Sequence, residues 1–193
     1  YMNAEGRFPV SKFKEFSYWG GAYDENLIQN TYYYLETGGV DYLFLMLDYY
    51  PTDDVLVWAD GVIKAHPNHR VVIATHSYLS ALGQIVDVET SGEFANDGMD
   101  IYNKIIYPND NVFMVFSGHE TSDDILMHQS VTKGGNVVME FIVDFQGLLI
   151  NDGLDALLGL FTFDELNQDL YIDYYSTYHQ KSFNIQNHYK VNF

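Results

Sequence analysis

The chain contains no cysteine among its 193 residues, and this absence excludes three kinds of chemistry at once. Disulfide bonds, thiolate metal sites and cysteine nucleophiles all require a thiol. The absence carries no information about the cellular compartment, because a cysteine-free chain can occur in any of them.

Basic residues are also scarce. Nine Lys and Arg residues stand against 27 Asp and Glu residues, which gives a formal net charge of −18. This charge opposes the counterion release that drives proteins onto nucleic acid, and it opposes attraction to anionic lipid. We therefore expect no nucleic-acid partner and no binding to an anionic membrane. The acidity, together with many Tyr and Asn residues and few Lys residues, suits an extracellular or cell-envelope protein.

Long hydrophobic runs are missing as well. No segment approaches the length of a membrane span, and no signal-peptide pattern is visible, so we expect no membrane-spanning segment. Apolar residues make up 47% of the chain, which at this length supports a single globular domain over residues 1–193. The chain begins with Tyr1 followed by Met2, and we therefore expect a processed product or a piece of a longer protein.

The first half of the chain has a strand, helix, strand order. Residues 31–36 and 40–47 are β-prone runs around a Gly-Gly turn, which predicts a hairpin. Residues 52–66 begin with Thr and two Asp residues, the signals of a helix amino terminus, and they predict a helix. A second strand follows at 71–76, and such a unit favours an α/β layered sheet.

The second half repeats a helix followed by a strand. Residues 99–107 have the apolar spacing of a helix and stop at Pro108, and residues 112–119 have the pattern of a buried strand. Three more strand-like runs follow, which we expect to continue the sheet in antiparallel fashion, and the last residues predict an extended tail. These runs cover residues 136–145, 158–163 and 170–175, and the tail covers 183–193.

Two of the predicted strands end at a histidine, namely His76 and His119. In an open sheet flanked by helices, functional sites collect at the carboxyl ends of the strands. Two imidazoles in that position are candidate ligands of a metal ion. The alternative, a histidine held by hydrogen bonds at the rim of a sheet, stays open for both residues.

Ser77 follows His76 and suggests the strand-to-helix elbow of serine hydrolases. That elbow needs glycine two residues before and two residues after the serine, and Thr75 and Leu79 stand there instead. The pattern therefore disfavours a serine esterase. The other histidines are interpreted as helix caps or surface residues: His66, His69, His128, His179 and His188.

The chain resembles the carboxyl-terminal half of the calcineurin-like metallophosphoesterase family. The likeness extends over residues 30–180 and depends most on two strands that each end at a histidine, the second preceded by glycine. The matching segments are residues 42–48, the Trp58-bearing helix, 71–77, Gly118-His119-Glu120, 135–146 and 158–163.

The resemblance implies a layered β-sandwich flanked by helices, with a two-metal cluster at the carboxyl ends of strands. The cofactor would be a divalent transition metal, Mn, Fe or Zn, which activates a water for attack on a phosphoester. His76 and His119 match two family ligands of one metal. The resemblance also places Ser77, Tyr78, Glu120 and Thr121 near the substrate.

The chain departs from the family pattern in two places. The last histidine of the family's Gly-His-x-His motif, a ligand of the second metal, is replaced by Thr121. The earlier motifs Asp-x-His, Gly-Asp-x-x-Asp and Gly-Asn-His-Asp/Glu do not occur in these residues. We therefore expect an incomplete domain, whose missing ligands come from an amino-terminal half or from a partner chain.

Two functions follow as expectations. The first is a fragment of a metal-dependent phosphoester hydrolase, acting in its complete form on a phosphomonoester or phosphodiester and inactive as this chain alone. The second is a non-catalytic extracellular binding or structural domain, in which the 17 Tyr and 2 Trp residues form an aromatic surface for glycans.

Overall fold

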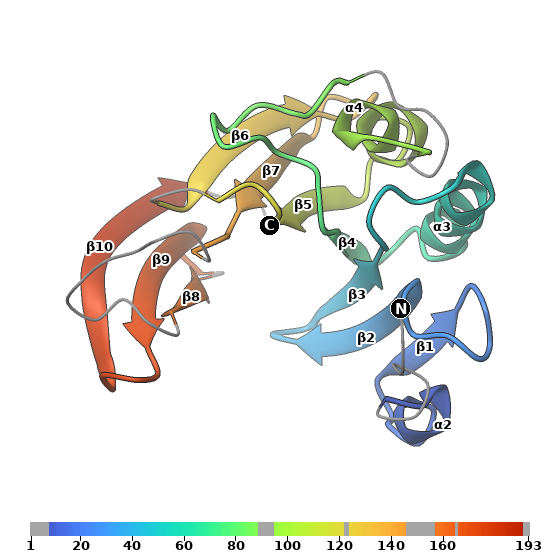
Figure 1. The fold of residues 1–193 in the computed structure, drawn as a ribbon, viewed down its shortest axis with the longest axis horizontal. Helices are drawn as coiled ribbons and strands as arrows, with labels where there is room; N and C mark the ends of the chain where they lie inside the picture. The colour runs from blue at the N-terminus through green and yellow to red at the C-terminus, as the bar shows by residue number, and fades with distance from the viewer. Residues whose placement is uncertain (1–7, 89–94, 122–123, 146–156, 165, 191–193) are drawn as a thin grey trace. The chain divides into compact units, whose positions relative to one another are not determined.

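A computed structural model of the chain describes residues 8–88, 95–121, 124–145, 157–164 and 166–190. The chain forms two compact units: Tyr1–Glu120 with Leu126–Ile142, and Thr121–Ile125 with Val143–Phe193. The structure is mixed α/β, with one large sheet, one small sheet and few helices (Figure 1). Residues 89–94, residue 146 of the matched segment and residues 191–193 of the predicted tail lie outside the described residues.

The first unit is built on a seven-stranded sheet in the order β1-β2-β3-β4-β5-β7-β6. Its middle strands β3, β4, β5 and β7 run parallel to one another, and the pairs β1–β2, β2–β3 and β6–β7 are antiparallel. The strands are β1 (Trp19–Ala22), β2 (Thr31–Thr37), β3 (Val40–Met46), β4 (Arg70–Ala74), β5 (Val112–Ser117), β6 (Leu126–Val131) and β7 (Val137–Ile142).

The predicted hairpin is confirmed by β2 and β3, which pair from Thr31 with Met46 to Thr37 with Val40. Gly38 and Gly39 connect them with φ angles of 61° and 80°. A two-residue loop with both φ angles positive matches the right-handed twist of the strands, and only glycine adopts it without steric cost.

The predicted first helix is confirmed by α3 (Asp53–Ala65). Asp53 and Asp54 occupy its first turn and Lys64 its last, which suits the helix dipole at both ends. Its apolar residues recur at helical spacing and are buried against the sheet. These residues are Val55, Leu56, Ala59, Val62 and Ile63.

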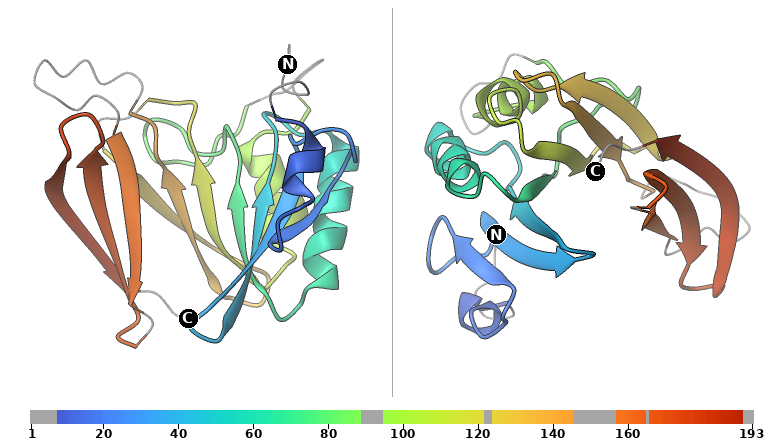
Figure 2. Two further views of the ribbon diagram at one scale, coloured as in Figure 1. Left: turned by 90° about the horizontal axis from the view of Figure 1, so that it is seen from below. Right: turned by 180° about the vertical axis from the view of Figure 1, so that it is seen from behind.

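The predicted second helix is present in two pieces, α4 (Gly98–Ile101) and the π-helix η1 (Tyr102–Ile106). Asp97 caps α4 by accepting a hydrogen bond from the backbone of Asp100 at 2.9 Å. Both pieces lie on the same face of the sheet as α3 and contribute to one core with it (Figures 1 and 2). A further short helix, α2 (Val10–Phe13), precedes β1.

The later strands correct the sequence-based prediction of a simple antiparallel continuation. β7 pairs in parallel with β5, and the edge strand β6, which the sequence pattern does not predict, returns antiparallel to β7. β6 and β7 are joined by a turn at Gly134 and Gly135. The local pattern identifies β7 as a strand but contains no information about its distant partner.

The second unit contains a separate antiparallel sheet in the order β10-β9-β8. Its strands are β8 (Leu157–Asp164), β9 (Asp169–Ser176) and β10 (Lys181–Lys190). β8 and β9 confirm two of the predicted strands and their antiparallel pairing. The segment from residue 183 is part of a paired strand, so the prediction of an extended tail is correct in conformation but omits its place in the sheet. In the described part of the chain, no helix is long and apolar enough to cross a membrane.

Candidate functional site

Three neighbouring parallel strands end at one edge of the large sheet. The backbone hydrogen bonds between these strands continue beyond the strand ends: Leu47 N donates to Ala74 O at 2.8 Å, and Thr75 N donates to Phe116 O at 3.0 Å. The residues that follow β3, β4 and β5 therefore meet at that edge, as expected for parallel strands.

His76 and His119 are brought together at this edge. His119 Nδ1 lies 3.2 Å from His76 Nε2, and the two ring centroids are 5.0 Å apart. Both residues are exposed to solvent. Two nitrogens that bind one tetrahedral zinc ion at about 2.0–2.1 Å each lie about 3.3 Å apart. The two imidazoles therefore have the separation that two ligands of the same metal require.

Tyr49, which follows β3, completes the cluster. Its hydroxyl lies 3.3 Å from His119 Nε2, and its ring contacts both imidazoles, with centroids 5.2 Å from His76 and 4.9 Å from His119. Burial, followed by the neighbouring Tyr50 and the charge of Glu120, raises the pKa of the Tyr49 hydroxyl above its usual value. Sequence reasoning did not single out Tyr49, although the predicted strand, helix, strand order places the end of β3 beside that of β4.

The loop that carries Tyr49 is fixed by hydrogen bonds on both sides. Asp48 N donates to Asn30 Oδ1 at 2.9 Å, and Thr75 Oγ1 donates to Asp48 O at 3.2 Å. The side chain of Asp48 accepts a hydrogen bond from Tyr49 N at 2.8 Å. These contacts tie the residue before Tyr49 to β4 and to the start of β2, so the position of the tyrosine ring is set by the sheet.

Backbone strain is concentrated at the same edge. Tyr50 and His119 have φ angles of 47° and 72°, in the left-handed region that disfavours residues with a side chain. The other two such residues among those described, Gln168 and Gln180, lie in the turns of the small sheet. Histidine is, with asparagine and aspartate, among the side-chain-bearing residues found most often in this region, and the turn after β5 uses it there.

The strain at His119 gives a direct prediction. His119→Gly is expected to be more stable than His119→Ala by about 1 kcal/mol, because glycine adopts a φ of +72° without steric cost. Both variants lack the imidazole, so the difference reports the backbone alone. The measurement is the free energy of unfolding from urea denaturation.

The matched control is His76, which is not among the residues with positive φ. There the order should reverse, with His76→Ala more stable than His76→Gly, since glycine gains only unfolded-state entropy. Equal stability of the two His119 variants would contradict the assignment of strain to this residue.

Ser77 and Tyr78, the predicted substrate-proximal residues next to His76, are both buried. Ser77 is 5% exposed and Tyr78 is fully buried. The Tyr78 hydroxyl donates to Glu140 Oε1 at 2.5 Å, so its side chain lies in the core beneath α4 and η1. Glu120 is exposed and lies close enough to influence Tyr49 electrostatically. Thr121 is exposed and belongs to the second unit.

Glu140 on β7 is a fully buried carboxylate, and it corrects the interpretation of His128 as a plain surface residue. Oε1 accepts from Tyr78 at 2.5 Å and from Ser130 Oγ at 2.7 Å, and His128 Nδ1 lies 2.6 Å from Oε2. Burial, and then the charge of Glu140, raises the pKa of the Tyr78 hydroxyl. Three donors thus hold one charge inside the unit, as a buried carboxylate requires.

The residues at the sheet edge fit a metal only in part. The described residues contain no group of three or more His, Asp or Glu side chains that could hold a metal ion. His76 and His119 are two nitrogen ligands, which suit Mn, Fe or Zn, and a closed site needs at least two more. The pair therefore fits one half of a metal site.

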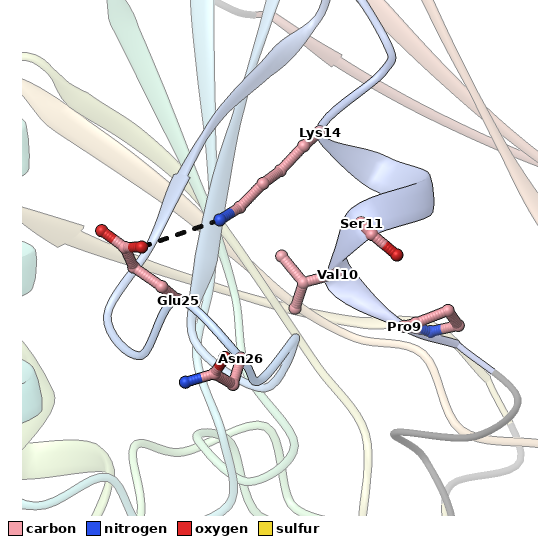
Figure 3. Close-up of a pocket in the computed structure, with 6 residues that line it drawn as sticks. All are labelled: Pro9, Val10, Ser11, Lys14, Glu25 and Asn26. Carbon is pink, nitrogen blue, oxygen red and sulfur yellow. Dashed lines mark ion pairs between the residues drawn. The ribbon is translucent and has the colours of Figure 1, made fainter.

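A pocket lies elsewhere on the first unit, between α2 and the turn after β1 (Figure 3). Its volume is about 570 Å³, and Lys14 reaches across it toward Glu25, with 3.9 Å between their charged atoms. The residues that line it contain no histidine. They are Pro9, Val10, Ser11, Lys14, Glu25 and Asn26.

Comparisons with known proteins give one informative similarity. No family model matches the chain. The chain is 30% identical over 175 residues to the uncharacterized protein YvnB of Bacillus subtilis (strain 168). The match covers 89% of this chain but 13% of that relative, so the chain spans a small part of the length of the protein it resembles.

Proposed function

We propose that the chain is the carboxyl-terminal portion of a metallophosphoesterase-like hydrolase, and that His76 and His119 are two ligands of one divalent metal. The observation that carries the proposal is the separation of 3.2 Å between His119 Nδ1 and His76 Nε2 at the carboxyl ends of adjacent parallel strands.

The proposed roles of this chain are to bind one metal and to form one wall of the site. The bound metal would activate a water for in-line attack on a phosphoester. His76 and His119 would each present one imidazole nitrogen, and exposed Glu120 would border the substrate. The remaining metal ligands, and the acid that would protonate the leaving group, would come from another segment or a partner chain.

The activity test follows from this division of the site. The 193-residue chain alone should give negligible turnover of a generic aryl phosphate with added Mn²⁺ or Zn²⁺. The product of the complete reading frame should hydrolyse it, and His119→Ala should abolish that turnover. His179→Ala is the matched control, since His179 is an exposed histidine of the second unit. Metal-dependent turnover by the chain alone, lost in His119→Ala, would contradict the proposal that the chain lacks part of the site.

A second candidate function is glycan binding, and one observation favours it. Phe16 and Tyr18 are 47% and 45% exposed, and their rings stack with centroids 5.0 Å apart. Tyr33 and Trp19 extend this group of aromatic side chains over β1 and β2. Exposed aromatic rings offer stacking surfaces for sugar rings. Retardation in polysaccharide-containing gels that disappears in Tyr18→Ala would favour this function over the hydrolase.

A further inference from the structure

We propose that the pocket between α2 and the turn after β1 binds one sugar ring of a neutral glycan. The inference deepens the second candidate function and rests on it. Phe16 and Tyr18 would stack on rings of the glycan, and the pocket would hold a further ring by hydrogen bonds. The pocket adds polar contacts to a surface that otherwise offers stacking alone.

The lining of the pocket matches the surface of a sugar ring. Such a ring has an apolar face and a rim of hydroxyl groups, and each hydroxyl can donate and accept hydrogen bonds. The volume of about 570 Å³ lies within the range of about 300–1,000 Å³ that is usual for small-molecule sites. Pro9 and Val10 line the pocket with apolar atoms, and Val10 is only 4% exposed. Ser11 and Asn26 add a hydroxyl and a carboxamide to the lining.

Lys14 and Glu25 face each other across the pocket (Figure 3). Their charged atoms, Nζ and Oε2, are 3.9 Å apart, and their side chains are 45% and 88% exposed. An exposed ion pair of this length contributes little to stability, so both groups can take other partners at small cost. One hydroxyl of a sugar can accept from Lys14 while its neighbour donates to Glu25. Each of these hydrogen bonds involves a charged group, and such bonds are stronger than neutral ones.

The two walls of the pocket are held in place by hydrogen bonds of their own. In the turn, the backbone N and the side-chain Nδ2 of Asn26 donate to Asp24 Oδ1 at 2.9 and 3.2 Å, and Leu27 N donates to Asp24 O at 3.1 Å. On the other side, Lys14 N donates to Val10 O at 3.0 Å. A ligand therefore meets a largely preformed site, and less conformational entropy is lost on binding.

The charges around the pocket favour a neutral ligand. Lys14 and Glu25 balance each other, whereas the whole chain carries 27 acidic and 9 basic residues and a net charge of −18. This net charge repels phosphorylated sugars and uronic acids. A cationic ligand would meet the ammonium group of Lys14 inside the pocket. An uncharged sugar avoids both penalties and uses both charged groups as hydrogen-bonding partners.

The pocket and the stacked aromatic pair belong to one continuous segment. Only two peptide units separate Lys14 from Phe16, so their Cα atoms lie no more than about 7.6 Å apart. Backbone hydrogen bonds from Phe16 N to Phe13 O at 3.1 Å and from Trp19 N to Phe16 O at 3.0 Å hold this segment in place. A glycan of a few rings is therefore long enough to contact the pocket and the aromatic pair together.

The experiment is native electrophoresis of the 193-residue chain in gels that contain soluble starch, xylan, galactomannan or hydroxyethyl cellulose. At least one of these neutral polysaccharides should retard the wild-type chain, and the acidic polysaccharide polygalacturonate should not. The dependence of mobility on polysaccharide concentration gives the Kd. Glu25→Ala should raise this Kd about 10-fold, which is the effect of losing one hydrogen bond to a charged group.

Glu15→Ala is the matched control, because Glu15 is an exposed glutamate of the same segment that does not line the pocket. Both variants lose one negative charge, so their mobilities should match in gels without polysaccharide. The Kd of Glu15→Ala should equal that of the wild type. Should Glu25→Ala fail to fold, Lys14→Ala repeats the test on the other charged group, with Lys12→Ala, an exposed lysine of α2, as its control.

Three results overturn the inference. If no neutral polysaccharide retards the wild-type chain, glycan binding fails and the inference fails with it. If retardation is lost in Tyr18→Ala but Glu25→Ala and Lys14→Ala bind as tightly as their controls, the inference alone is overturned. Stronger retardation by polygalacturonate than by every neutral polysaccharide overturns the assignment of a neutral ligand.

Discussion

Glu140→Ala is expected to lower the free energy of unfolding by about 3–5 kcal/mol, the range typical for breaking a buried charged network. The carboxylate is fully buried, and its removal leaves Tyr78, Ser130 and His128 without their common acceptor. It also leaves a cavity that the core fills only in part. Urea denaturation monitored by circular dichroism measures the change.

Two further variants separate the network from the loss of volume. Glu140→Gln keeps the shape and one acceptor oxygen, so it should lose less stability than Glu140→Ala. Glu36→Ala removes an exposed glutamate at the end of β2 and should change stability by no more than about 0.5 kcal/mol. A Glu140→Ala protein as stable as Glu36→Ala would mean that the buried network does not hold β6 and the segment containing Tyr78 in place.

Gly98→Ala is expected to destabilise the first unit by about 3 kcal/mol, the upper part of the usual range for overpacking. A Cβ atom at this position would lie 2.4 Å from the backbone oxygen of Tyr78 and 3.1 Å from the backbone N and O of Val86. Backbone atoms cannot move aside as a flexible side chain can. The same segment is bonded through Val86 N to Tyr78 O at 2.9 Å and Met99 N to Val86 O at 2.8 Å.

Gly61→Ala provides the matched control within the same unit. Gly61 lies inside α3, and a Cβ atom there meets nothing within 4 Å. Alanine is the better helix former, so Gly61→Ala should raise the free energy of unfolding by about 0.5–1 kcal/mol. The two substitutions should therefore change the free energy of unfolding in opposite directions, as measured by urea denaturation or thermal denaturation. A Gly98→Ala protein as stable as the wild type would contradict the close packing of α4.

The elements that sequence predicted correctly are those with local signals. Each of these signals consists of a few residues that are adjacent in sequence, and each corresponds to a boundary of a helix or strand in the structure. They are the Gly38-Gly39 turn, the acidic first turn of α3 and the stop at Pro108. β6 carries no such signal, because His128 and Ser130 make it look polar. Their polar atoms face the buried Glu140, which lies 12 positions from His128 and 10 positions from Ser130 in sequence.

The residues of the candidate site also differ in whether the local sequence identifies them. His76 and His119 could be found from sequence because each ends an apolar run, and the parallel order of β4 and β5 brings them together. Tyr49 could not be ranked from its residue type, since the chain has 17 tyrosines. Its importance depends on the register of β3 against β4, and the strain at His119 becomes visible only in the backbone.

The central claim, that His76 and His119 are ligands of one metal, is tested most directly by elemental analysis of the product of the complete reading frame. The account predicts a bound transition metal that His76→Ala and His119→Ala each remove in the same amount, and that His179→Ala retains. It also predicts that the 193-residue chain alone purifies without a stoichiometric metal. A transition-metal content that is unchanged in both His76→Ala and His119→Ala would contradict it.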